Sequence, residues 1–255
     1  MYNIIDDNFN LHACKIPGLT NGMKVLQLPG LTYVDSGLSC DTFNIIHITN
    51  GSTAVAGDIQ QAVHYYTARQ LAFCVWICRE NLTATVMAAF EQLHLKQQNA
   101  EPGMLLHLDG YQPVHPPAHT SAIVANNITV IEDYAAVTAA NWSPPDGNVI
   151  AYYKKAAPAI LNNAQHIHFA VFYESGQPAS VIEMFGTNNA VVGLYGLATL
   201  QSHRGKGIGT ALMQFALNNA KALGYKQVIL QASEDGLGIY SKLGFEVMTT
   251  YYEFA

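Results

Sequence analysis

The sequence is poor in charged residues and has no long apolar run. Only 12% of its 255 residues are charged, whereas 50% are hydrophobic. Disordered chains combine low hydrophobicity with high charge, so this composition predicts a folded protein. The longest apolar candidate, Leu71 to Cys78, ends at Arg79 and Glu80, well short of the roughly 18 residues that a membrane span requires. We therefore expect no membrane association.

Basic residues are also scarce. The chain has 12 Lys and Arg against 18 Asp and Glu, a formal net charge of -6. Binding to nucleic acid depends on clustered Lys and Arg, so we expect no nucleic-acid partner. An acidic balance permits a cationic amine as a partner without identifying one.

Cysteine is rare too. Cys14, Cys40, Cys74 and Cys78 have neither the density of a disulfide framework nor paired C-x-x-C spacing, which is typical of a reducing compartment. The N-terminal segment Met1–Asp7 carries acid where a secretory signal has a basic region and an apolar core. These features predict a cytoplasmic protein.

A metal site is not indicated. His166 and His168 form an H-x-H pair on one face of a predicted strand, yet no third ligand is placed by spacing. Packed or exposed histidines are the alternative that we favour, and we predict no metal.

A proline-rich stretch from Asp109 to Thr120 divides the chain. Pro113, Pro116 and Pro117 lie within it, and proline fixes φ and removes a backbone donor, so no regular helix is expected there. We predict an N-terminal domain at 1–115 and a second domain at 121–255. Both are long enough to bury a core.

The hydrophobic patterns predict two α/β domains. In the first, strands at 41–46, 73–78 and 102–108 are separated by helices at 58–72 and 82–93. The second begins with a strand-like run at 128–131, followed by helices that end near 140 and 161. Strands at 168–173, 179–185 and 190–200 come next, and their short turns imply antiparallel pairing. A helix after the loop at 201–206 precedes a strand at 228–231, a helix at 237–243 and a strand at 245–254.

The most informative segment is Leu197–Thr210, in which a strand enters a glycine-rich turn and then a long helix. Gly205, Gly207 and Gly209 lack a Cβ, so the backbone can approach a ligand closely, and the first N–H groups of the helix lack intrahelical acceptors. Arg204 and Lys206 add positive charge. The pattern predicts a site for a pyrophosphate.

Two common phosphate-binding motifs do not fit this segment. A Walker loop requires Ser or Thr after Gly-Lys, but Lys206 precedes Gly207. A dinucleotide-binding fold requires G-x-G-x-x-G, and Thr210 stands where its third glycine is needed. Only 20 residues follow Asp235, too few to complete a doubly wound sheet. A nicotinamide oxidoreductase is therefore disfavoured.

Arg204, Gly207 and Gly209 form R-x-x-G-x-G, an arrangement that resembles the phosphate-binding motif of the GNAT superfamily of acyl-CoA N-acyltransferases. Residues 232–245, with Tyr240 before Leu-Gly-Phe, resemble the following strand and helix of that superfamily. The resemblance implies an α+β (α/β) fold with a mixed, largely antiparallel sheet flanked by helices, and a catalytic domain at 121–255. We call the glycine-rich turn at 204–210 the cradle. The first domain faintly resembles degenerate GNAT modules and has no such R-x-x-G-x-G cradle, so we expect no CoA there.

The same resemblance implies acetyl-CoA as co-substrate and assigns residues to it. The strand that ends near Thr199 is expected to splay from the strand at 228–231, leaving backbone groups that pantetheine pairs with. Ser233 is expected near the pantetheine or its thioester. The expected contacts to acetyl-CoA lie at Leu197, Ala198, Thr199, Arg204, Gly205, Lys206, Gly207, Ile208, Gly209, Thr210, Ser233 and Tyr240.

Direct attack of an amine on a thioester requires an unprotonated amine, a stabilised oxyanion and a proton for the leaving thiolate. Tyr240 matches the superfamily's proton donor, and the oxyanion is expected near the amide of Leu197. The strand at 190–200 carries no acid, so Glu183 on the neighbouring strand is the candidate base. A water chain, or a Glu183 that merely faces solvent, is the alternative.

These features predict an N-acetyltransferase that acts in a ternary complex on a small-molecule or peptide amine. A non-catalytic acyl-CoA sensor is the other hypothesis, because the strand before the cradle lacks an acid. The retained Tyr240 favours the enzyme. The acceptor's identity and the oligomeric state are not determined by the sequence.

Overall fold

The structure is a computed structural model and describes residues 2–114, 121–187 and 190–255. The chain forms two compact units, one from residues 1–104 and 231–255 and the other from residues 105–230. This grouping differs from the predicted division at 1–115 and 121–255 because strand β11 (Glu246–Phe254) pairs antiparallel with β4 (Cys74–Cys78). Half of the predicted proline-rich boundary, at 115–120, lies outside the described residues.

The first unit combines a mixed sheet with helices. Its strand order is β1-β2-β3-β4-β11-β5, in which β3 and β4 run parallel and β1, β2 and β3 run antiparallel. Its remaining elements are α1 (Tyr2–Leu19), β1 (Lys24–Leu28), β2 (Leu31–Asp35), β3 (Ile45–Ile48), α2 (Ala56–Thr67), a 3-10 turn (Arg79–Asn81), α3 (Ala84–Gln92), β5 (Gln97–His107, which continues into the second unit) and α7 (Glu234–Lys242).

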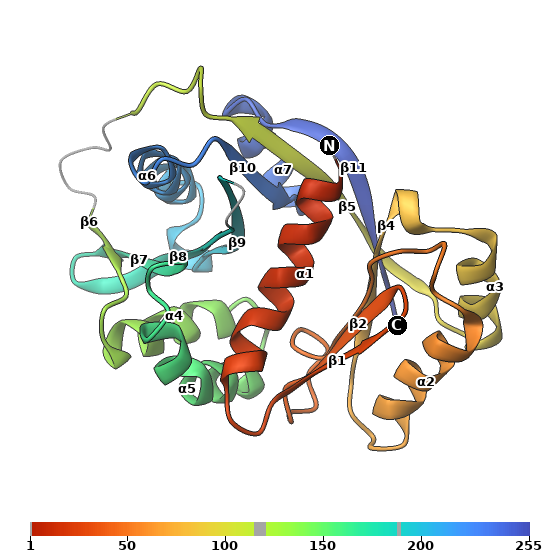
Figure 1. The fold of residues 1–255 in the computed structure, drawn as a ribbon. Coiled ribbons are helices and arrows are strands. Elements are labelled where there is room, and N and C mark those ends of the chain that lie inside the picture. Colours follow the sequence, from red (N-terminus) through yellow and green to blue (C-terminus); the bar gives the residue numbers. More distant parts are fainter. Residues whose placement is uncertain (1, 115–120, 188–189) are drawn as a thin grey trace. The chain divides into compact units, whose positions relative to one another are not determined.

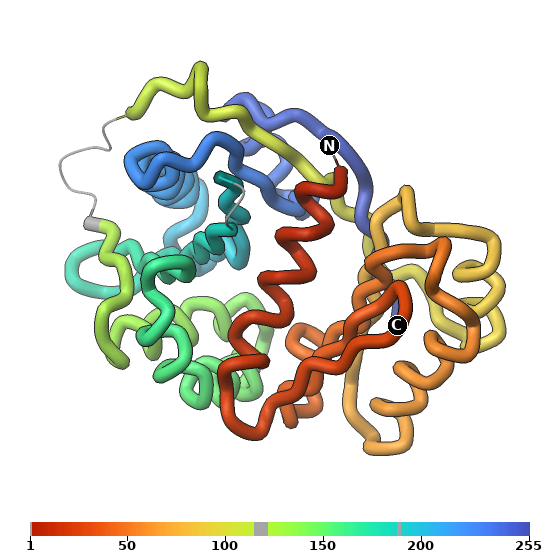
Figure 2. The backbone as a smooth tube through the Cα atoms, viewed as in Figure 1, coloured from red at the N-terminus to blue at the C-terminus, as the bar shows by residue number. Residues whose placement is uncertain are grey.

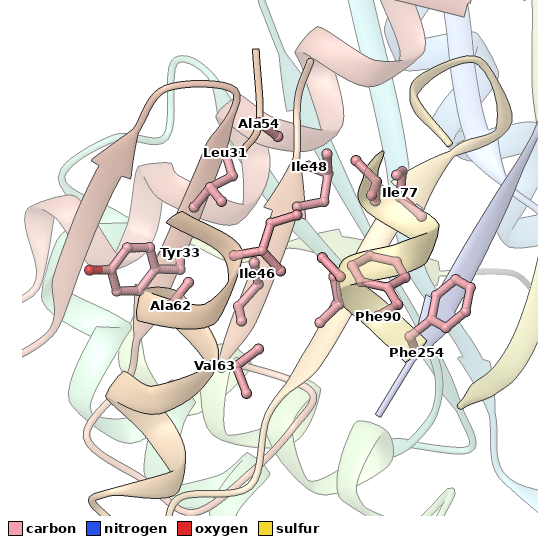
Figure 3. Close-up of a cluster of buried hydrophobic side chains, with 14 of the residues drawn as sticks. Leu31, Tyr33, Ile46, Ile48, Ala54, Ala62, Val63, Ile77, Phe90 and Phe254 are labelled. Carbon is pink, nitrogen blue, oxygen red and sulfur yellow. The ribbon is translucent and has the colours of Figure 1, made fainter. Parts of the chain in front are cut away.

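The core of the first unit lies between the sheet and helices α2 and α3. Figure 3 shows Ala62 and Val63 of α2 and Phe90 of α3 packed with strand residues such as Ile46 and Ile77. Burying such side chains stabilises the fold by about 1.5–3 kcal/mol each. Helix α1 is absent from the predicted elements because polar Asp6 and Asn8 occupy buried positions and mask its apolar pattern.

The second unit contains a sheet with the order β10-β9-β8-β7-β6. Pairing is antiparallel from β6 to β9, which confirms the prediction for β7, β8 and β9, whereas β9 and β10 are parallel. Helices α4 and α5 cover one face and α6 covers the other (Figures 1 and 2). The elements are β6 (Ser121–Val124), α4 (Ile128–Ala139), α5 (Gly147–Leu161), β7 (Ile167–Glu174), β8 (Gln177–Gly186), β9 (Val191–Thr199), a 3-10 turn (Gln201–His203), α6 (Ile208–Ala222) and β10 (Gln227–Gln231).

The element order predicted for 121–255 is confirmed with two corrections, whereas α1, β1 and β2 of the first unit were not predicted. The run at 128–131 is the first turn of α4 and not strand-like, because the Asn127 side chain accepts a hydrogen bond from the N–H of Val130 at 3.1 Å and starts the helix there. Strand β6 is an additional element that the sequence analysis did not predict. Within the described ranges, no helix has the length and apolar character needed to cross a membrane.

Candidate active site

Strands β9 and β10 separate after a short parallel contact. Residues Val191–Gly193 pair with Gln227–Ile229, and within the described residues this pairing goes no further, although β9 continues to Thr199. Backbone groups beyond Gly193 that face β10 therefore need partners other than β10. This geometry agrees with the predicted splay beside Leu197, Ala198 and Thr199.

The other edge of β9 is interrupted by a β-bulge. Glu183 lies opposite Tyr195 and Val181 lies opposite Ala198. One residue of β8 therefore faces two of β9, Gly196 and Leu197. Gly196 has φ of +60° and an exposed backbone. The bulge thus lies at the level where the two strands have already parted.

The start of α6 forms an open corner. Gly207 precedes the helix with φ of 78°, and no side chain caps the first turn. Gly205 is also left-handed, and a Cβ built on either glycine meets no atom within 4 Å. The first-turn N–H groups of α6, at Ile208, Gly209 and Thr210, lack intrahelical acceptors and lie at the positive end of the helix dipole. This corner fits an anionic group such as a pyrophosphate.

Basic side chains around this corner are engaged by the protein. Arg204 donates from Nε to the carbonyl oxygen of Thr199 at 3.0 Å and from Nη2 to Oδ1 of Asn141 at 3.2 Å. Lys206 Nζ lies 3.4 Å from Oε2 of Glu174. In this structure Arg204 therefore joins the end of β9 to the end of α4, while the exposed Lys206 pair is weak and leaves that side chain able to reach an anion.

Glu183 is buried, with only 3% of its surface exposed, so the solvent-facing alternative is wrong. It lies opposite Phe169 on β7 and Tyr195 on β9, and directly opposed residues share one face of a sheet. The aromatic side chains Tyr134 and Tyr153, from α4 and α5, contact the Phe169 ring on that face.

Burial raises the pKa of Tyr134, Tyr152 and Tyr153, and the nearby charge of Glu183 raises each one further. The tyrosine hydroxyls near Glu183 therefore stay neutral and can donate hydrogen bonds to a carboxylate. No local motif pointed to this group, because its members come from α4, α5 and β8.

Ser233 and Tyr240 belong to the first unit. Ser233 caps α7, its Oγ accepting a hydrogen bond from the N–H of Gly236 at 3.3 Å. Tyr240 lies in α7 and is 7% exposed, with its ring centroid 6.0 Å from that of Phe245. Burial, and then the charge of Glu101, raise the pKa of Tyr240 to about 12. The phenol keeps its proton at neutral pH, as a proton donor requires.

The structure thus brings the predicted ligand residues at 197–199 and 204–210 to one corner of the second unit, with Glu183 on the next strand. It adds Asn141, which is 63 residues from its partner Arg204 and carries no sequence signal. His168 lies on β7, where burial lowers its pKa. The described part of the chain holds no group of three or more His, Cys, Asp or Glu placed for a metal ion.

Comparison with known proteins agrees with this geometry. Residues 143–255 match the model of the acetyltransferase (GNAT) domain family. A GCN5-related N-acetyltransferase from Kribbella flavida has a TM-score of 0.73 at 15% identity, covering 98% of this chain and 95% of that one. A second, from Sphaerobacter thermophilus, has a TM-score of 0.62 at 18% identity, covering 90% and 81%.

A tandem GNAT protein from the clavulanic acid biosynthesis pathway has a TM-score of 0.58 at 11% identity, with 92% of this chain and 83% of that chain covered. At such identities these structures show a shared fold, and they show it over both units. Residues 143–255 thus match a GNAT acetyltransferase domain, and the fold of the chain is similar to that of these GNAT structures.

Proposed function

We propose that this protein is an acetyl-CoA-dependent N-acetyltransferase that acetylates a primary amine by direct attack in a ternary complex. The open corner at the start of α6 is the observation that carries this proposal. A Cβ built on either of its left-handed glycines, Gly205 and Gly207, would meet no atom within 4 Å. Helix α6 also lacks a side-chain cap and has no acid in its first turn. An anion is the ligand that these features favour.

The separated strands support a ligand that continues from this corner. An extended, amide-rich arm such as pantetheine pairs with free backbone groups as an added strand does, and β9 beyond Gly193 offers such groups toward β10. In this proposal Leu197, Ala198 and Thr199 hold the pantetheine arm. Residues from Arg204 to Thr210 hold the pyrophosphate, and Ser233 lies near the thioester.

Bound acetyl-CoA supplies the thioester on which the acceptor acts. The Leu197 N–H donates a hydrogen bond to the oxygen that becomes negative. Glu183 removes a proton from the acceptor amine, because β9 itself offers no carboxylate. Tyr240 donates a proton to the leaving sulfur, since its phenol is protonated at neutral pH. Four free cysteines support a reducing, cytoplasmic location.

The test is a transfer assay with acetyl-CoA and a panel of small primary amines and amine-bearing peptides, in which thiol release and acetylated product are both measured. We expect release of one thiol for each product formed. Tight acetyl-CoA binding without thiol release for any acceptor would favour the sensor hypothesis. Calorimetry that detects no acetyl-CoA binding would overturn both.

A further inference from the structure

The hydroxyl of Tyr134, from α4, lies at the bulge of β9. A Cβ built on Gly196 would lie 2.7 Å from Tyr134 Oη, and the next atom, Cζ, is 3.9 Å away. The hydroxyl alone therefore contacts this position. Gly196 is exposed, whereas Tyr134 is 1% exposed. Tyr134 thus ends at the boundary between the protein interior and the surface where β9 has left β10.

The other side of Tyr134 faces the environment of Glu183. Its ring centroid lies 4.6 Å from that of Phe169 in an edge-to-face contact, and Phe169 is the cross-strand partner of Glu183. Tyr134 and Tyr153 are joined by a side-chain hydrogen bond, and both lie close enough to Glu183 for its charge to raise their pKa values. Tyr134 therefore contacts the bulge through its hydroxyl and lies near the buried carboxylate through Phe169.

Tyr134 and Tyr153 lie on the face of the sheet opposite the cradle. Helix α6, which begins at the open corner, covers one face of β8 and β9, while α4 and α5 cover the other (Figure 1). Under the proposed function, a donor held at α6 and an acceptor on the α4 and α5 side would meet at the bulge. Gly196, which is exposed, lies at that bulge.

We propose that Tyr134 passes the acceptor's proton to Glu183. The inference rests on the proposed function and names the route by which its base works. The ammonium nitrogen gives one proton to Tyr134 Oη, while the Tyr134 hydroxyl gives its own proton through Tyr153 to the Glu183 carboxylate. Both tyrosines remain neutral, Glu183 becomes a carboxylic acid, and the amine gains the lone pair that attacks the thioester.

The experiment compares Tyr134→Phe with Tyr152→Phe, a matched control because Tyr152 is also buried near Glu183 but is not at the bulge. Each variant is assayed with an alkylamine, which is protonated at neutral pH, and with an alkoxyamine, which is not. Tyr134→Phe should slow the alkylamine reaction about 10²-fold and the alkoxyamine reaction less than about tenfold. Tyr152→Phe should leave the ratio of the two rates unchanged.

The rate ratio does not depend on the folded fraction, because misfolding lowers both rates equally. Glu183→Gln should lower the ratio as Tyr134→Phe does, and the double variant should lower it no further if the two residues share one path. The proton route would be overturned if Tyr134→Phe lost the same factor with both acceptors or lost activity with neither. It would also be overturned if Tyr152→Phe changed the rate ratio as Tyr134→Phe does. The proposed transferase activity would stand in each of these cases. A wild-type protein that binds acetyl-CoA but acetylates neither amine would overturn the transferase and the route together.

Discussion

Both units contain a corner in which a strand is followed by a loop and a helix: β3 and α2 in the first unit, and β9 and α6 in the second. The two corners differ in whether their backbone groups already have partners in the protein. In the first unit, β3 pairs with parallel β4 along its whole length. In the second, β9 leaves parallel β10 after Gly193. The loop of the first unit is closed by Asn81, which accepts a hydrogen bond from the N–H of Gly51 and donates one to the carbonyl of Thr49.

The glycines show the same contrast. A Cβ on Gly51 would collide with the backbone of Asn81, whereas Cβ atoms on Gly205 and Gly207 would meet nothing. Helix α2 also carries Asp58 in its first turn, which balances its dipole, while α6 has no acid there. This contrast favours anion binding at the corner whose backbone is not already satisfied by the protein.

Closing the open corner should have the largest effect. We expect Gly207→Glu to abolish acetyl-CoA binding, because a carboxylate at the start of α6 repels phosphate and a side chain strains the left-handed backbone. Gly224→Glu is the matched control, since Gly224 is also left-handed with open space but follows the other end of α6. Calorimetry with acetyl-CoA should show loss only in the first variant. Equal affinities would sink the cradle assignment.

Removing the proposed proton donor should lower turnover about 10²-fold without changing acetyl-CoA affinity. Tyr240→Phe keeps the packing against Phe245 and loses only the hydroxyl. Tyr252→Phe, on the strand that follows, serves as the control. Steady-state rates and calorimetry measure the two effects separately. Unchanged turnover in Tyr240→Phe would remove that residue from the acid role.

Removing Asn81 from the corner between β3 and α2 should lower the stability of the fold without changing acetyl-CoA binding. Asn81→Ala leaves the buried N–H of Gly51 without its acceptor, and we expect a loss of about 1–3 kcal/mol in the free energy of unfolding. Chemical denaturation measures this loss, and the exposed Asn126→Ala should change it by less than about 0.5 kcal/mol. Acetyl-CoA affinity should stay the same in both. Weaker binding in Asn81→Ala would indicate that the first corner contributes to the ligand site.

The smallest effect is expected from the exposed pair beside the cradle. Glu174→Gln removes the negative charge near Lys206 and His203, so acetyl-CoA should bind slightly more tightly, by less than about tenfold. The gain should decrease as salt is added, because exposed charges are screened. Weaker binding in this variant would show that Glu174 positions Lys206 for the ligand.

The open corner could be predicted from the sequence because its chemistry is local. The glycine spacing at 205–209 and the helix that follows depend only on residues that are neighbours in the sequence. The order of elements from α4 to β11 follows from hydrophobic periodicity. The first turn of α4 was the exception. Its β-branched residues favour a strand, but the cap at Asn127 and burial of Val130 and Ile131 favour the helix.

What the chain alone determined is the order of elements from α4 to β11, the cradle motif and Tyr240 before its Leu-Gly-Phe turn. Only the tertiary structure decided where β9 leaves β10, that Glu183 is buried among tyrosines, that Arg204 contacts Asn141, and that β11 pairs with β4. These features depend on strand register and on contacts between residues far apart in sequence. Neither is encoded in any local pattern, because each arises only when separate elements pack together.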